Sequence, residues 1–234
     1  MDRRQFNSVS TPTLATLIGL SHQHALALSL GDLTNAEASQ GLKTALEKGA
    51  LAAISTLGKT DGFLLNDKVR IPLPGFLDRA ANLLRTLGQG GRIDELITSM
   101  NRAAETAVPQ ARDMLVGAVK SMSVEDAKKI LGGGDTSVTS FFAEKTRVPL
   151  GTKFLPVVTQ ATEKVGLARQ YNDIAGKAAG MGLMNKDDAN IQQYVTGKSL
   201  DGLYFMIGEE EKKIRQDPIG TGSAILKKVF GVLK

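Results

Sequence analysis

Apolar residues recur at three- and four-residue steps through the stretch 92–122, the spacing that puts side chains on one face of an α-helix. At a rise of about 1.5 Å per residue, such a helix would span roughly 45 Å, enough to cross a whole domain. Pro109 has no N–H to donate to the carbonyl of Glu105, so we expect a kink or break near Thr106–Val108. The pattern predicts a long, kinked central helix on which shorter helices pack.

Similar apolar patterns on both sides of this stretch predict further helices. Residues 59–75 interrupt them with two prolines among apolar residues, which indicates an ordered loop or a short extended segment. Alternation with a period of two never continues beyond a few residues, so the predicted fold is all-α, a single multi-helix bundle. The expected flanking helices cover residues 34–57, 74–87, 124–131, 135–146, 152–165, 168–179, 187–195 and about 198–216.

The first 27 residues have the features of a targeting segment. Arg3 and Arg4 form a basic head, an uncharged and moderately apolar run follows, and Ala25 and Ala27 have the small-x-small spacing of a signal-peptidase site. The order Arg3-Arg4-Gln5-Phe6 also resembles the twin-arginine export motif. The alternative is a frayed or docked N-terminal helix. We expect a cleaved signal peptide at 1–27, a single helical domain at 28–234 and a periplasmic location.

Cleavage after Ala27 would remove both histidines of the chain, His22 and His24. Because the sequence has no Cys and no Trp either, the mature domain lacks the residues of serine triads, cysteine–histidine pairs and structural zinc sites. Any catalysis would depend on carboxylates, Lys, Tyr or Ser, with or without an oxygen-ligated metal. The sequence gives no reason to expect a cofactor.

The charge distribution restricts the classes of partner. The formal net charge is +5, charges of both signs are interspersed, and only 5% of the residues are aromatic. The stacking residues and basic stripe of a nucleic-acid-binding protein are missing, so we expect no nucleic acid. No window reaches the roughly 18 uncharged apolar residues of a membrane-spanning helix. An unknown protein or a small apolar ligand is the expected partner, and the oligomeric state stays open.

Two polar groups are candidates for a ligand or partner groove between the central and C-terminal helices. Asn101 and Glu105 are four residues apart on one helical face, where they could converge with Arg102 on a ligand or a partner helix. The alternative is an ordinary surface pair between Arg102 and Glu105. Tyr171 and Asn172 form the second group. Adjacent helical residues face different ways, so at most two such side chains can point into one pocket, and the alternative that we favour is a satisfied, buried Tyr171.

The C-terminal tail is basic and amphipathic. Lys227 and Lys228 lie beside apolar residues at helical spacing, among them Phe230, a combination that lets a short helix lie on an anionic membrane surface. The alternative is that Phe230 docks on the domain while the lysines remain in water. We therefore expect either peripheral membrane contact or docking of this tail.

Four sequence blocks resemble the bacterial domain-of-unknown-function family 4197. They are NDKVRIPLP at 66–74, MNRAAETAVPQA at 100–111, KKILGGGDTSVTSFF at 128–142 and GLYFMIGEEEKKIRQDPIGTGSAILKKVFG at 202–231. The resemblance extends from about Leu30 to the C-terminus, and the order and spacing of the blocks make it specific. It implies an exported, all-helical protein of Gram-negative type, and it brings no activity, cofactor or catalytic residue.

Two functional hypotheses follow from the sequence. The first is an exported, non-enzymatic binding or interaction module. The alternative is a carboxylate-based enzyme, with or without a divalent metal. A pocket holding two or more inward carboxylates from different helices would favour the enzyme, and an apolar groove would favour the binding module.

Overall fold

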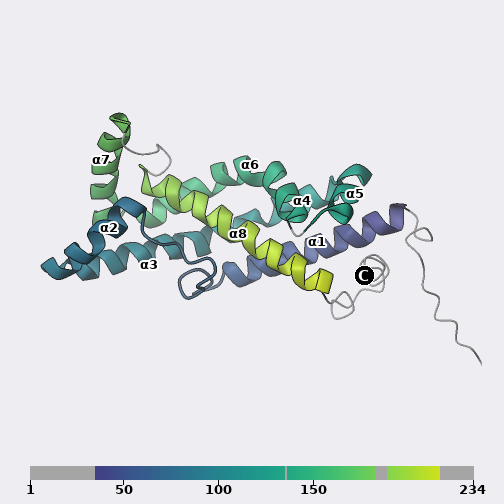
Figure 1. Cartoon of the computed structure of the whole chain (residues 1–234), viewed down its shortest axis with the longest axis horizontal. Helices are drawn as coiled ribbons and strands as arrows, with labels where there is room; N and C mark the ends of the chain where they lie inside the picture. The colour runs from purple at the N-terminus through teal and green to yellow at the C-terminus, as the bar shows by residue number, and fades with distance from the viewer. Residues whose placement is uncertain (1–34, 135, 183–188, 217–234) are drawn as a thin grey trace, which may run out of the picture.

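The computed structural model describes residues 35–134, 136–182 and 189–216, and in these ranges it contains eight α-helices and no strand (Figure 1). The all-α prediction is therefore confirmed. The predicted signal peptide and the tail with Lys227, Lys228 and Phe230 lie outside the described residues. The helices are α1 (Asn35–Leu57), α2 (Gly75–Leu84), α3 (Gly90–Ala107), α4 (Arg112–Lys120), α5 (Val124–Gly132), α6 (Ser137–Thr162), α7 (Gly166–Gly180) and α8 (Ile191–Gln216).

The bundle is elongated, and α6 and α8 run along much of its length (Figure 1). Helix α8 packs against both α6 and α1, while α3 packs mainly against α6. Helix α7 stands across one end of the molecule (Figure 1). The inward faces of these helices form one hydrophobic core, and its largest wholly buried side chains are Phe63, Phe142, Phe154, Leu42, Leu57, Ile71, Ile93, Leu96, Met100, Leu115, Ile130 and Leu150.

The stretch predicted as the central helix is divided at Pro109. It consists of α3, a 3-10 turn at Val108–Ala111 and α4. The apolar face predicted from the sequence is buried on both sides of this turn, with Met100 on α3 and Leu115 on α4 wholly inaccessible. Pro109 itself is exposed, and its ring packs close to Gly58 at the end of α1.

Helix α6 corrects one boundary prediction. The sequence predicts two helices separated between residues 146 and 152, but α6 is continuous through Pro149 and Pro156. Both prolines lie on the exposed side, where water can satisfy carbonyl groups that lose their helical partner, and the opposite side is anchored in the core. Helix α8 is likewise one helix through Gly197, where the sequence predicts a break.

The loop at 58–74 joins α1 to α2 and is ordered, as the sequence predicts. Phe63 is wholly inaccessible, and Val69, Ile71 and Leu73 are also buried. These side chains attach the loop to the core although it has no regular secondary structure. The loop is therefore packed as part of the domain, and it forms part of the surface beside α3.

Candidate functional site

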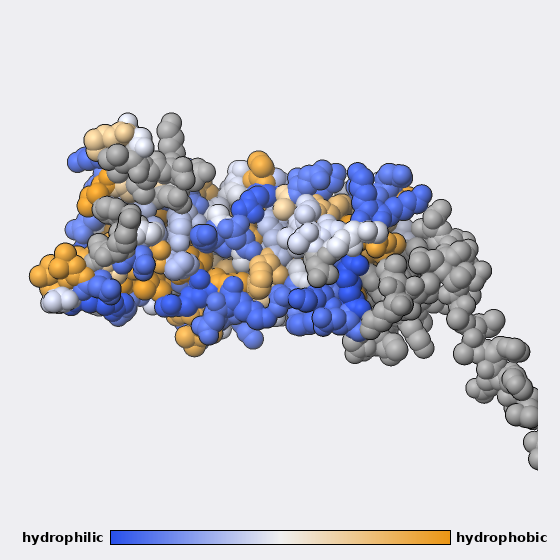
Figure 2. All heavy atoms as spheres, in the orientation of Figure 1, coloured by the Kyte–Doolittle hydropathy of each residue, from blue (hydrophilic) through white to orange (hydrophobic). Residues whose placement is uncertain are grey.

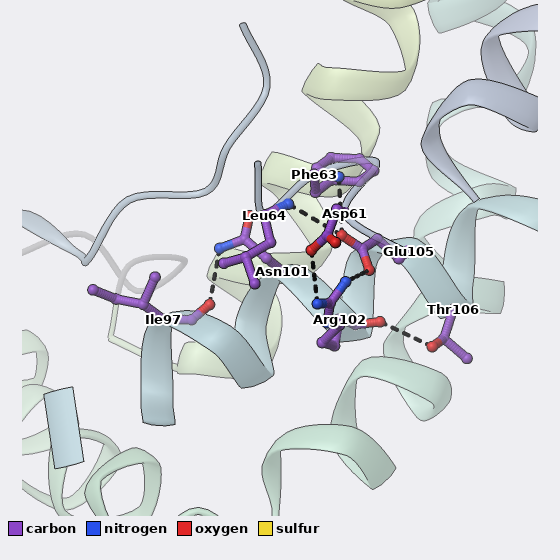
Figure 3. A network of polar contacts seen from close by, with 8 residues as sticks. All are labelled: Asp61, Phe63, Leu64, Ile97, Asn101, Arg102, Glu105 and Thr106. Atoms are coloured by element: carbon purple, nitrogen blue, oxygen red, sulfur yellow. Dashed lines mark hydrogen bonds and ion pairs between the residues drawn. The ribbon is translucent and has the colours of Figure 1, made fainter. Parts of the chain in front are cut away.

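A buried carboxylate on α3 holds the first part of the 58–74 loop (Figure 3). Glu105 is only 5% exposed, and its Oε1 accepts hydrogen bonds from the backbone N–H groups of Phe63 (3.0 Å) and Leu64 (3.1 Å). Its Oε2 accepts from Nη1 of Arg102 at 2.7 Å, and Nη2 of Arg102 donates to Oδ1 of Asp61 at 2.7 Å. The hydrogen bonds to Glu105 and Asp61 raise the pKa of Arg102. The carboxylate is thus balanced by a cation and by two backbone donors.

Asn101, one turn earlier on the same helix, holds the second part of the loop. Its side chain is wholly buried, and Oδ1 accepts from the backbone N–H of Ile71 at 2.8 Å. Its Nδ2 donates to the carbonyl oxygens of Ile71 (3.0 Å) and Ile97 (2.8 Å). The amide therefore satisfies both backbone groups of a buried loop residue, as a neighbouring strand would.

The local sequence permits this path of the loop at two glycines. A Cβ on Gly62 would lie 2.4 Å from the carbonyl oxygen of Leu57, so a side chain does not fit there. On the other side, a Cβ on Gly202 of α8 would lie 2.7 Å from the ring of Phe63. The loop is thus inserted between α3 and α8, and Phe63 fills the space in which the sequence led us to expect a groove between the central and C-terminal helices.

The structure brings Asn101, Arg102 and Glu105 together, but their polar atoms converge on the loop of the same chain (Figure 3). The pair formed by Arg102 and Glu105 differs from the simple surface pair considered above, because Glu105 is buried. A direct contact of these residues with a ligand stays a prediction. Sequence reasoning missed Asp61 as their partner, although the apolar residues of the loop had indicated that it packs on the core.

Beside this network, the loop and α3 enclose an open hollow of about 420 Å³, which we call the loop–α3 hollow. Leu65, on its rim, is 74% exposed. Hydrophobic atoms are visible at the surface of this loop, at the lower edge of the view in Figure 2. The hollow combines apolar and charged groups, and its lining residues are Leu64, Leu65, Asp67, Arg70, Asp94, Ile97 and Thr98.

One carboxylate that lines the loop–α3 hollow, Asp94, is paired with an arginine. Arg85 forms two hydrogen bonds to the carboxylate of Asp94, with distances of 2.5 and 3.3 Å. The hydrogen bond to Arg85 is the main cause that lowers the pKa of Asp94, and the positive charge of Arg70 acts in the same direction. The hollow therefore presents fixed charges around an apolar floor.

Tyr171 and Asn172, the second candidate pair, lie on α7, and their side chains have different surroundings. Tyr171 is only 3% exposed. Asn172 donates from Nδ2 to Oε1 of Gln192 (2.9 Å), and its Oδ1 accepts from the backbone N–H of Ile191 (2.8 Å). Gln192 donates in turn to Oγ1 of Thr162 at 3.2 Å. Asn172 thus connects α7 to the first turn of α8, and it also borders an open hollow of about 460 Å³.

A smaller hollow between α5 and α6, of about 250 Å³, has carboxylates from two helices, Asp126 and Glu144. Asp126 belongs to the capping box of α5, where Ser123 donates to it from its backbone N–H and its hydroxyl group. These hydrogen bonds lower the pKa of Asp126. Within the described ranges, we find no group of three or more His, Cys, Asp or Glu side chains placed to hold a metal ion.

Among the helices of the described residues, none combines the length and apolar character needed to cross a bilayer.

Comparison with known proteins identifies one family. No curated protein and no solved structure matches the chain. The profile of a family described as "Protein of unknown function (DUF4197)" matches residues 32–231, which is most of the sequence and includes every element described above. The chain therefore belongs to the DUF4197 family, as the four sequence blocks had indicated.

Proposed function

We propose that this protein is an exported, non-enzymatic interaction module that presents Leu65 and the loop–α3 hollow to a partner protein. The observation that carries this proposal is the exposure of Leu65, at 74%, on a loop whose backbone is fixed by two side chains of α3. Exposed apolar residues also occur singly elsewhere on the surface, but Leu65 borders a hollow that Leu64 and Ile97 also line, and this combination favours a binding surface.

The fixed loop favours binding because little conformational entropy remains to be lost. Glu105 and Asn101 hold the loop from α3, and α8 holds it from the other side. There, Nζ of Lys68 forms an ion pair with Glu209 at 2.5 Å, and the hydroxyl group of Tyr194 donates to the carbonyl oxygen of Pro72 at 3.1 Å. Ordering a loop upon association costs free energy, and these contacts reduce that cost.

The chemistry of the loop–α3 hollow indicates the kind of partner. Leu64, Leu65 and Ile97 supply apolar surface, while Asp67 and Arg70 place opposite charges on the rim. An apolar side chain of the partner would enter the hollow, and polar groups beside it would meet these charges. Such an arrangement is an apolar centre with a polar rim, as in protein interfaces generally.

The state of the carboxylates supports binding over the alternative of a carboxylate-based enzyme. A general acid needs a raised pKa, so that it still holds its proton at neutral pH. In the loop–α3 hollow the pKa of Asp94, and in the hollow between α5 and α6 the pKa of Asp126, is lowered by hydrogen bonds. Each of these two carboxylates accepts hydrogen bonds from neighbouring residues and is ionised at neutral pH.

Export is supported by Arg3, Arg4 and the Ala25-Leu26-Ala27 sequence, and its test is separate from that of binding. We expect N-terminal sequencing of the native protein to begin at Leu28. Recovery of a cytoplasmic protein with residues 1–27 intact would refute the proposed location. Replacement of both arginines by lysine without loss of export would refute the twin-arginine route.

Binding is tested with native mass spectrometry of protein isolated from its native compartment. We expect the wild-type protein to retain a partner and Leu65→Asp to lose it. Val148→Asp is the matched control, because Val148 is an equally apolar and 81% exposed residue on α6. Equal retention by both variants would refute the proposed surface, and equal thermal unfolding of the two would show that folding is unaffected.

A further inference from the structure

Another hollow lies at the place where Pro109 interrupts the central segment. It is formed by the last turns of α1 and the start of α4, and its volume is about 450 Å³. A Cβ on Gly58 would lie 2.7 Å from Cγ of Pro109, so the two segments approach closely at the base of the hollow. The residues that line it are Leu51, Ile54, Ser55, Gly58, Lys59, Pro109 and Arg112.

The lining divides into an apolar part and a basic part. Leu51, Ile54 and Pro109 supply apolar surface, and the two charged residues, Lys59 and Arg112, are both positive. Neither Lys59 nor Arg112 forms an ion pair with a carboxylate in the part of the chain that the structure describes.

The geometry points to a binding site for a single-chain anionic amphiphile, a molecule of the fatty-acid type. Its carboxylate would lie between Lys59 and Arg112, and its hydrocarbon chain would cover Leu51 and Pro109. Guanidinium groups bind carboxylates through paired hydrogen bonds, and the volume is within the range of small-molecule sites, about 300–1,000 Å³.

Two properties of the hollow favour this ligand over other anions. A small polar anion would leave the apolar surface of Leu51 and Pro109 in water, while an uncharged hydrocarbon would gain nothing from the two cations. An amphiphile satisfies both parts at once. The site is separate from the loop–α3 hollow, so its ligand does not depend on the interaction proposed above.

The test is isothermal titration calorimetry of the full mature chain with decanoate, used below the concentration at which it forms micelles. We expect saturable binding of one decanoate, with affinity reduced at least about tenfold in Lys59→Gln and in Arg112→Gln, which corresponds to about 1.4 kcal/mol. Lys128→Gln is the charge-matched control, because Lys128 is an exposed lysine on α5 outside this hollow. Its affinity should equal that of the wild-type protein.

Three results would overturn the assignment. They are the absence of saturable binding, equal losses in Arg112→Gln and Lys128→Gln, and equal affinity for decanol, which has the chain without the charge. Vesicles containing phosphatidylglycerol distinguish a free amphiphile from a membrane surface. Binding to vesicles that depends on Arg112, without binding to decanoate, would assign the two cations to lipid headgroups and would also refute the proposed site.

Discussion

Replacement of Glu105 by alanine tests whether one carboxylate holds the 58–74 loop against α3. In the native protein, Oε1 of Glu105 accepts from the N–H groups of Phe63 and Leu64, and Oε2 accepts from Arg102. Glu105→Ala removes all three acceptor contacts. No other side chain in the described network is placed to take over the two backbone donors.

The size of the effect follows from the surroundings of each donor. The N–H of Phe63 is buried and that of Leu64 is partly buried, so their loss of an acceptor costs about 2 and about 1 kcal/mol. The side chain of Arg102 is 37% exposed and keeps its charge in contact with water, so it adds little. We expect a loss of about 3 kcal/mol in the free energy of unfolding, or about 6–12 °C in Tm for a domain of this size.

The assay is urea unfolding followed by circular dichroism, together with amide hydrogen exchange of Phe63 and Leu64. Glu105→Gln is the control that keeps the acceptor oxygen, and we expect it to lose only about 1 kcal/mol because the ion pair with Arg102 disappears. A loss below about 1 kcal/mol in Glu105→Ala, or unchanged exchange at both amides, would refute the reasoning.

Three further predictions concern other parts of the fold. Gly62→Ala should lower the free energy of unfolding by more than about 1 kcal/mol, because the new methyl group would overlap carbonyl oxygens at 2.4 and 2.6 Å. Gly117→Ala in α4 is the control: its methyl group meets nothing within 4 Å, so the free energy of unfolding should rise by about 0.5–1 kcal/mol in thermal denaturation. Burial raises the pKa of Tyr204, so its contribution to stability is complete below about pH 10 and declines as the pH rises through the folded-state pKa. Tyr204→Phe should remove this alkaline decline. Hydrogen bonds lower the pKa of Asp126, so its contribution is present above about pH 4 and declines as the pH falls through the folded-state pKa. Denaturation at a series of pH values should show Asp126→Asn less stable than the wild-type protein at neutral pH, with the difference closing in acid.

Local signals in the sequence were sufficient for most of the fold. The helical spacing in the stretch 92–122 and the capping sequence beginning at Ser123 correspond to helices in the structure. The predicted break between residues 146 and 152 is wrong, and Pro149, which local preference would keep out of a helix interior, lies inside α6. In α6 its exposed position limits the cost of a proline, and the packing of the opposite face on α3 and α8 outweighs it.

The candidate site was only partly accessible to sequence reasoning. The spacing of Asn101 and Glu105 shows that they share a face, and this holds in the structure. Their partners are the backbone groups of Phe63 and Ile71, which lie in the loop before α2 and are therefore separated from α3 in the chain by a whole helix. No pattern of residue types in the sequence encodes such a contact. The exposure of Leu65 is equally invisible, because its neighbours Phe63 and Leu64 are just as apolar and only the path of the loop separates them.

The proposed interaction surface is tested most directly by photo-crosslinking in cells that express the protein. A benzophenone amino acid replaces Leu65 in one variant and Val148 in the other, since both side chains are exposed and apolar. We predict an adduct of one discrete size from position 65, none from position 148, and a weaker adduct from position 65 when Glu105→Ala releases the loop. The absence of an adduct at position 65, or the same adducts from both positions, would contradict the proposal that the 58–74 loop presents the binding surface.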